Sequence, residues 1–226
     1  MLLTLSLVAG LSHFAVGASR LNEENEFLCR HSTAALFAAP DSPDFRKYAP
    51  DRNVDILHLA LDVTPDFHLR TVAGQAILTF KPIAKPLEEL RLDAVDLHVQ
   101  SVTASEKIAG HQVTDTAILI TFAKPIPAGK ETKVTVKYTA EPRKGMYFRT
   151  PEMGDKPDET HLATQGEATE ARHWYPGFDA PNEKFTSEIT ARVPTGMTVL
   201  SNGRLVSTER DAKTVLLVMR WSQEKP

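Results

Sequence analysis

Side chains that could do chemistry gather in one short stretch, residues 164–184, which reads "TQGEATEARHWYPGFDAPNEK". It combines an amide, carboxylates, an arginine and a Trp-Tyr-Pro run, whereas most of the surrounding sequence alternates between apolar and polar residues. Two explanations compete for this density: a packed structural corner, or the wall of a binding site. In the first, Glu167 would be an acidic residue stabilised at the N-terminus of a short helix.

Motifs for a complete catalytic centre are absent from this sequence. A hydrolytic zinc site needs paired histidines on one helix face and a carboxylate. None of the 8 histidines is followed by Glu and no two are four positions apart, so there is no HExxH. The nucleophile elbow GxSxG and the phosphate-binding glycine loops are also missing. The chain alone is therefore predicted to bind no metal and to be inactive.

Composition narrows the class of protein. The 226 residues contain 26 Lys and Arg against 29 Asp and Glu, with no block of like charge, so a nucleic-acid partner is not expected. A hydrophobic content of 42% is typical of a globular protein. Cys29 is the single cysteine, which excludes an intramolecular disulfide and a multi-thiolate zinc site.

The N-terminal 18 residues, "MLLTLSLVAGLSHFAVGA", are apolar and end in small residues, which is typical of a signal peptide. Val16 and Ala18 would suit the peptidase, so that the mature protein would start near Ser19. No Lys or Arg precedes the apolar run, which leaves a retained membrane anchor or a misplaced start codon as alternatives. We expect a secreted or periplasmic protein without stable membrane insertion. Residues 19–46 are interpreted as a linker or docking arm, and residues 47–226 as the globular part.

The globular part shows the period of two that is typical of strands. Leu57, Leu59, Leu61 and Val63 are predicted to share one face, and Gly74 suggests a bulge or a close backbone approach. Strands are predicted over 54–63, 72–80, two parts of 87–104, 116–122, 132–138, 185–194 and 213–222.

Turn residues predict how some of these strands connect. Residues 116–122 and 132–138 are expected to pair across the Pro- and Gly-containing segment between them. Asn202-Gly203 predicts a hairpin turn, and 208–212 a second one. The best helical candidate is one or two turns over Glu167 to His173. The prediction is an all-β fold, a β-sandwich or several packed sheets. Because the sequence stops just after a strong strand, a fragment or a truncated gene model is expected.

The chemistry-bearing stretch and its neighbours resemble the aminopeptidase N family of gluzincin zinc aminopeptidases, which includes the leukotriene hydrolase-aminopeptidases. The resemblance rests on Gln165-Gly166-Glu167, Ala171-Arg172, Tyr175-Pro176, Asp179, Pro181, Val193-Pro194 and Ser201-Asn202-Gly203. Upstream, "VDILHLALDVTPD", "VAGQAILTF" and "KGMYFRT" occur in the order expected for the family. The resemblance implies a saddle-like, multi-sheet N-terminal β domain. The catalytic domain, with its GxMEN and HExxH motifs, would follow it and is absent from this chain.

The resemblance also implies roles for individual residues. Gln165 and Glu167 would bind the free α-amine of a peptide substrate, through amide and carboxylate oxygens. Independently of the resemblance, the residue types favour a structural pair of Arg172 and Asp179 that fixes the loop, and packing of the Trp-Tyr-Pro run in the core. The parent enzyme would use zinc and act on peptide N-termini together with the missing catalytic domain. The alternatives are a free-standing β-sandwich binding module and a noncatalytic scaffold.

Overall fold

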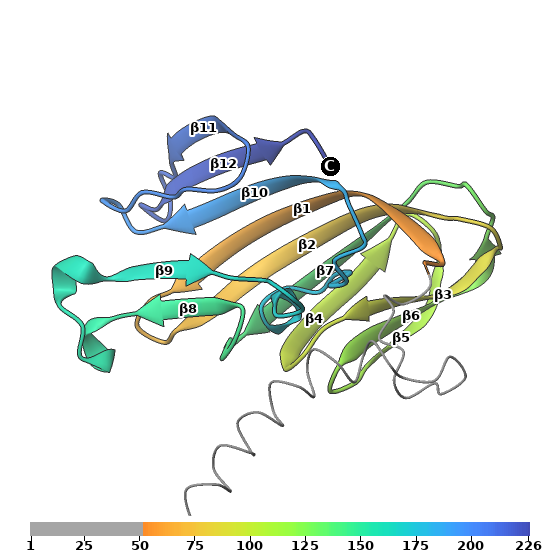
Figure 1. Cartoon of the computed structure of the whole chain (residues 1–226), viewed down its shortest axis with the longest axis horizontal. Helices are drawn as coiled ribbons and strands as arrows, with labels where there is room; N and C mark the ends of the chain where they lie inside the picture. Colours follow the sequence, from red (N-terminus) through yellow and green to blue (C-terminus); the bar gives the residue numbers. More distant parts are fainter. Residues whose placement is uncertain (1–51) are drawn as a thin grey trace, which may run out of the picture. The chain divides into compact units, whose positions relative to one another are not determined.

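The computed structural model describes residues 52–226, which fold into a multi-sheet β domain (Figure 1). The described part has no α-helix, only 3-10 turns: η1 (Pro151–Met153), η2 (Pro157–Glu159) and η3 (Ala171–His173). None of its helices is long and apolar enough to cross a membrane. The predicted signal peptide (1–18), the predicted arm (19–46) and Cys29 lie outside the described residues.

The largest sheet has seven strands in the order β11-β12-β10-β1-β2-β7-β4. Its members are β1 (Val54–Asp66), β2 (Thr71–Pro82), β4 (Leu97–Ala104), β7 (Thr132–Ala140), β10 (Thr186–Val193), β11 (Arg204–Arg210) and β12 (Leu217–Gln223). All neighbouring pairs are antiparallel except β1 and β10, which run parallel. The parallel pair lies at the centre of the sheet and brings together two segments far apart in the sequence.

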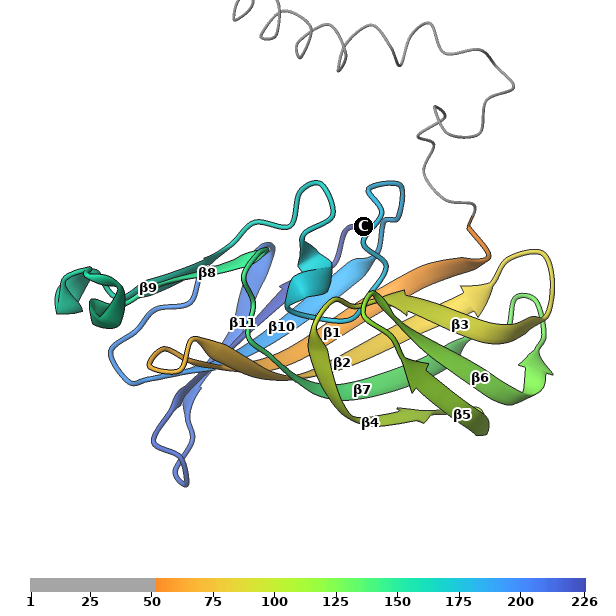
Figure 2. The same cartoon turned by 90° about the horizontal axis from the view of Figure 1, so that it is seen from below.

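Two smaller sheets complete the domain. One contains β3 (Leu87–Asp93), β6 (Ala117–Ile126) and β5 (Ile108–Val113), in the order β3-β6-β5. The other is an antiparallel ribbon of β8 (Met146–Arg149) and β9 (His161–Thr164). Figure 2 shows the three-stranded sheet beside β4 and β7, with the β8–β9 ribbon at the other end of the domain.

The core follows from alternation, because every second side chain of a strand points to the same face. Buried residues of the seven-stranded and three-stranded sheets belong to one cluster, which includes Leu78, Phe80, Leu90, Leu92, Ile118, Ile120, Val134 and Val136. Gly74 on β2 permits the ring of Tyr138 to approach the backbone closely, as predicted. A Cβ atom there would lie 2.5 Å from the phenol oxygen of Tyr138, so the buried ring needs glycine at this position.

A bulge in β1 changes which residues face the core. The ladder between β1 and β2 skips Leu57, so Val54 and Ile56 are buried before it and Leu59 and Leu61 after it. Without the extra residue, period two would turn one of these two pairs to the opposite face. The prediction that Leu57 shares the buried face is therefore wrong: Leu57 is half-buried and lies outside the core.

Two predicted connections are also wrong. Residues 116–122 and 132–138 form β6 and β7, but these strands lie in different sheets, and β6 pairs with β3 and with the unpredicted β5. Asn202-Gly203 does not join a hairpin, because residues 197–201 form no strand and β11 pairs with β12 alone. The second predicted hairpin is present as β11–β12, although its turn lies after Arg210 rather than over 208–212.

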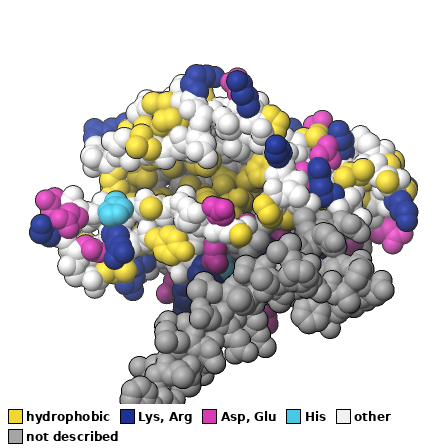
Figure 3. Space-filling model, in the orientation of Figure 1, with side chains coloured by type: hydrophobic (Ala, Val, Ile, Leu, Met, Phe, Trp, Pro, Cys, Tyr) yellow, Lys and Arg dark blue, Asp and Glu magenta, His cyan; other side chains and the backbone are white. Residues whose placement is uncertain are grey.

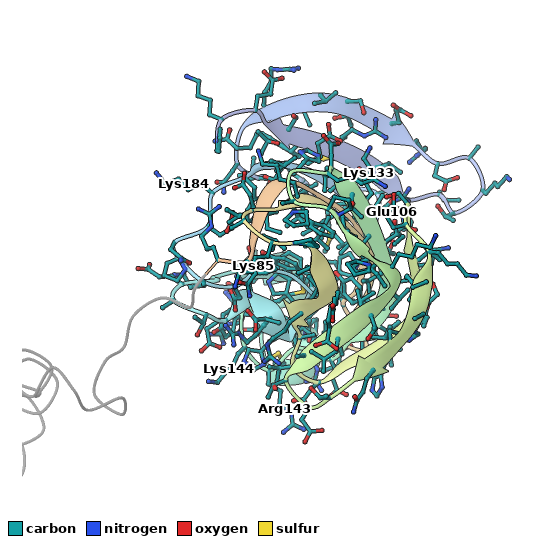
Figure 4. All side chains as sticks on the ribbon, turned by 90° about the vertical axis from the view of Figure 1, so that its right-hand side faces the viewer. Lys85, Glu106, Lys133, Arg143, Lys144 and Lys184 are labelled. Carbon is teal, nitrogen blue, oxygen red and sulfur yellow. The ribbon has the colours of Figure 1, made fainter. Side chains whose placement is uncertain are left out.

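Charged side chains are spread over the surface of the domain. Lys85, Lys133 and Lys184 lie on separate segments (Figure 4), and all three are exposed. Glu183 is an exception, because it is buried at the start of the loop before β10. Its Oε1 accepts hydrogen bonds from the backbone N–H of Ile56 at 3.1 Å and from Arg52 at 2.9 Å. This carboxylate therefore joins the start of β1 to the segment that leads into β10.

Candidate functional site

The chemistry-bearing loop starts where β9 ends, and β8 holds its first residues in place. The backbone N–H of Gln165 donates to the carbonyl of Gly145 at 2.9 Å, and that of Glu170 donates to the carbonyl of Gly166 at 2.9 Å. Gly145 has φ of +74°, and a Cβ atom there would lie 2.0 Å from the carbonyl oxygen of Glu170. Only glycine allows this contact, since its lack of a Cβ atom permits both the close approach and the positive φ.

An ion pair closes the far end of the loop. Oδ2 of Asp179 accepts hydrogen bonds from Nε of Arg172 at 2.8 Å and from the backbone N–H of Arg172 at 3.1 Å. Asp93 at the end of β3 exchanges two backbone hydrogen bonds with Gly177, of 2.8 and 3.1 Å. The predicted structural pair is therefore present, and it ties residues 172–179 to the three-stranded sheet.

The aromatic residues of the loop pack inward. Trp174 is buried, and its ring meets that of Tyr175 edge to face, with centroids 4.5 Å apart. Burial, together with the nearby charge of Asp179, raises the pKa of the Tyr175 phenol to about 12. Phenols in such an apolar setting stay protonated, because burial disfavours the charged form. These residues act as the base of the loop, in accord with the prediction that they pack in the core.

Gln165 and Glu167 lie on the outer side of the loop. Both side chains are exposed, and within residues 52–226 neither forms a hydrogen bond or an ion pair with a side chain or backbone group. Residues 167–170 form a turn, and the helix expected over 167–173 is limited to η3. Glu167 therefore has no helix N-terminus to stabilise, which removes the main structural explanation for a carboxylate here. Two acceptor side chains are available to a ligand.

A large hollow adjoins this loop. It has a volume of about 1040 Å³ and is bounded by β1, β10, the β8–β9 ribbon and residues 196–202. Gln165 lines it, whereas Glu167 is not among the lining residues. Figure 3 shows hydrophobic side chains inside the hollow, between the part of the surface over β10 and the part over β9. Sequence reasoning missed this feature because β1 is distant in the sequence from the other segments that bound it.

The described residues do not fit a metal site. No group of three His, Cys, Asp or Glu side chains within residues 52–226 lies close enough together to hold an ion. A catalytic zinc needs three protein ligands and an open position.

Comparison with known proteins identifies the domain. Residues 50–226 match the protein family described as the Peptidase M1 N-terminal domain. The chain is 26% identical to leukotriene A-4 hydrolase of Xenopus laevis over 81% of its length, and 30% identical to mitochondrial aminopeptidase 2 of Saccharomyces cerevisiae over 77%. The chain spans 31% and 19% of these two relatives, which is less than a third of their lengths.

A solved structure supports the fold. The crystal structure of an M1 zinc metallopeptidase of Deinococcus radiodurans, bound to a Tyr-Ser-Ala substrate, superposes with a TM-score of 0.65 at 18% identity. The match covers 78% of this chain and 40% of the other. At this level of identity the likeness establishes the all-β, multi-sheet architecture.

Proposed function

Because the chain belongs to the M1 peptidase family as its N-terminal domain, we propose that it helps a zinc aminopeptidase to hold the free α-amine of its peptide substrate. The loop of Gln165 and Glu167 would supply this contact. The reaction would be the release of N-terminal residues from peptides, with zinc and the general base supplied by a peptidase domain outside the described residues. In such an enzyme the zinc would activate a water molecule for attack on the peptide bond.

One observation supports the role of the loop most directly: its acceptor groups are free while its backbone is fixed. Gln165 and Glu167 are exposed and unpaired in the described domain, whereas Gly145 and Asp93 anchor the segments on either side. A backbone held in this way favours binding of an ammonium group, since only the two side chains then have to be ordered.

In an aminopeptidase, this contact would determine which peptide bond is cleaved. A carboxylate that accepts a hydrogen bond from an ammonium group forms a charge-assisted bond, which is stronger than a neutral one. Fixing the amine places the first peptide bond at a set distance from the loop. A metal site at that distance would then cleave this bond rather than an internal one.

The test is an enzyme in which residues 50–226 replace the matching part of the Saccharomyces cerevisiae aminopeptidase. Glu167→Gln removes the charge but keeps the size of the side chain. We expect kcat/KM for leucine 7-amido-4-methylcoumarin to fall by about 10- to 100-fold, the loss typical of one hydrogen bond to a charged group.

Glu209→Gln is the matched control, because Glu209 is an exposed carboxylate on β11 and its substitution changes the net charge equally. This control should keep kcat/KM within about twofold of the parent. An active enzyme in which both substitutions have the same effect would refute the amine-binding role of Glu167.

The hollow supports a second candidate, a free-standing domain that binds peptides without catalysis. Its lining mixes apolar and polar side chains, and its volume of about 1040 Å³ lies at the upper end of the range for ligand sites, roughly 300–1,000 Å³. The chimaeric enzyme described above distinguishes the two candidates. If the domain is only a binding module, Glu167→Gln should leave the turnover of the chimaera unchanged.

A further inference from the structure

The turn that carries Glu167 is closed by Glu170. The backbone N–H of Glu170 donates to the carbonyl of Gly166 at 2.9 Å, so residues 166–170 form one closed turn with Glu167 inside it. The carbonyl of Glu170 in turn accepts a hydrogen bond from the N–H of His173 at 3.3 Å. The backbone of Glu170 therefore connects the turn of the exposed carboxylate to η3.

The side chain of Glu170 lies between two basic groups that come from different segments. Lys144 belongs to the segment before β8 (Figure 4), and His173 belongs to η3. Oε1 of Glu170 lies 3.4 Å from Nζ of Lys144, and Oε2 lies 3.7 Å from Nε2 of His173. Within residues 52–226, neither basic side chain has another ion-pair partner. One carboxylate thus joins the start of the ribbon to the element that follows Glu167.

This carboxylate is only partly in contact with solvent. The side chain of Glu170 is 28% exposed, whereas its Oε2 is shielded from solvent and accepts no hydrogen bond within the described domain. A shielded carboxylate oxygen without a donor is unfavourable, and a basic group that faces it offsets part of this cost. The position of Glu170 therefore depends on the groups around it, and His173 is the basic residue on the shielded side.

The segment before β8 contacts the turn at both of its ends. The carbonyl of Gly145 accepts the N–H of Gln165 at 2.9 Å, while the carbonyl oxygen of Glu170 lies 2.0 Å from the place of a Cβ atom on Gly145. Lys144 adds the side-chain contact with Glu170 next to this backbone contact. A displacement of Glu170 from Lys144 would therefore also displace the turn that contains Glu167.

We propose that Glu170 is a positioning residue for the contact between Glu167 and the α-amine of the substrate. Its carboxylate, placed between Lys144 and His173, holds the turn so that Glu167 meets the amine at a fixed place. This inference rests on the proposed function, in which Glu167 binds the amine. Glu170 acts through Glu167 and need not touch the substrate, since both of its oxygens face basic groups of the domain itself.

The expected size of the effect follows from the strength of these contacts. A turn that is already fixed loses less conformational freedom when the amine binds, which favours binding. The ion pair with Lys144 is individually weak, because the lysine side chain is 59% exposed and solvent screens it. Loss of the positioning carboxylate should therefore cost less than loss of the amine-binding carboxylate of Glu167.

The first test places Glu170→Gln in the chimaeric enzyme described above. The substitution removes the charge and keeps the size of the side chain. We expect kcat/KM for leucine 7-amido-4-methylcoumarin to fall by about three- to tenfold. Glu159→Gln is the matched control, because Glu159 is an exposed carboxylate of η2 that lies 3.1 Å from Lys156. It should leave kcat/KM within about twofold of the parent.

A double variant separates positioning from general damage to the fold. A residue that acts through Glu167 should lose most of its effect once Glu167 no longer carries its charge. We expect Glu170→Gln to lower kcat/KM by at most about twofold in the Glu167→Gln background. An equal loss in both backgrounds, or no loss in the parent, would overturn the positioning role.

Glu167→Gln alone tests the amine-binding role, so a failure of the two proposals can be told apart. A loss of kcat/KM with Glu167→Gln and none with Glu170→Gln would contradict the positioning role only. No loss with Glu167→Gln would contradict the proposed function, and the positioning role with it.

Hydrogen exchange of the full chain, residues 1–226, tests the positioning without catalysis. Lys144→Met removes the cation but keeps an unbranched side chain. We expect the amides of Gln165 and Glu170, whose hydrogen bonds hold the turn, to exchange at least about threefold faster in this variant. Lys156→Met is the control and should leave both rates within about twofold. Unchanged exchange of both amides in Lys144→Met would show that the ion pair does not fix the turn, and would overturn the proposal.

Discussion

At the scale of single residues, the loop depends on one half-buried ion pair. The side chain of Asp179 is 9% exposed and accepts two hydrogen bonds from Arg172. Asp179→Ala would leave the guanidinium without this partner, so we expect the free energy of unfolding to fall by about 3 kcal/mol. Urea denaturation followed by tryptophan fluorescence measures the change.

An exposed pair provides the control for that substitution. The side chains of Arg204 and Glu224 are 67% and 72% exposed and lie 3.0 Å apart. Glu224→Ala should change stability by at most about 0.5 kcal/mol, because solvent screens such pairs. Comparable losses in the two variants would mean that the Arg172–Asp179 pair is not specifically stabilising.

Two buried phenols predict how stability changes with pH. Burial raises the pKa of Tyr138 and of Tyr175 above the ordinary value of 10.0, in the case of Tyr175 to about 12. The unfolded chain loses these protons from pH 10 upward while the folded chain keeps them, so the stability present below pH 10 is lost as the pH rises towards 12. We expect urea midpoints to fall steeply over this interval.

The double variant Tyr138→Phe/Tyr175→Phe separates this effect from general alkaline damage. It should show a flatter pH dependence between pH 10 and 12 than the parent protein, because neither phenylalanine titrates. Absorbance at 295 nm should reveal later ionisation in the folded parent than in urea. Equal slopes for parent and variant would assign the alkaline loss to other groups.

The sequence allowed part of the site to be predicted, and the reason lies in distance along the chain. Arg172 and Asp179 are close in sequence, so their pairing could be anticipated. The exposure of Gln165 and Glu167 depends on contacts of the loop with Gly145 and with β3, which no local pattern specifies. The resemblance to aminopeptidases supplied their candidate role, and this role stays a prediction.

At the scale of elements, the alternation of apolar and polar residues predicts the positions of most strands but not their pairing partners. Residues 116–122 and 132–138 were recognised as strands because each alternates or is continuously apolar. The Pro- and Gly-containing segment between them indicates a local hairpin, but the two strands belong to different sheets. The bulge at Leu57 was missed for a similar reason, since the buried residues on both sides of it are apolar.

Gly203 at the start of β11 gives a prediction at this scale. Its φ is +87°, and a Cβ atom would lie 2.1 Å from the carbonyl oxygen of Ser222 on β12. Gly196 has φ of +103° but no atom within 4 Å of such a Cβ. Gly196→Ala should therefore cost only the backbone strain of about 1–2 kcal/mol.

Gly203→Ala adds a backbone clash to that strain and should destabilise by at least about 3 kcal/mol. It should also speed amide exchange in β11 and β12, because the clash separates these strands. Thermal unfolding with hydrogen exchange measures both effects. Equal losses for the two glycines would show that β11 tolerates displacement from β12.

At the scale of the whole molecule, the described domain has the architecture of an M1 N-terminal domain but no cluster of metal ligands. We expect the chain 1–226 alone to show no zinc-dependent hydrolysis of leucine 7-amido-4-methylcoumarin, since a metal-bound water needs a coordinated zinc. Assays with and without added zinc sulfate, followed by a chelator, measure this. Turnover that the chelator abolishes would reveal a metal site involving residues outside 52–226.

The parallel pairing of β1 with β10 also bears on how the protein is made. His58 and Thr186 face each other across this pair although they are 128 residues apart in the sequence. A ribosome that adds about 5–20 residues per second needs roughly 6 to 26 seconds to synthesise the intervening chain. During that interval one edge of the newly made β1–β2 hairpin stays unpaired. A nascent-chain chaperone that shields this edge would improve the yield of folded protein.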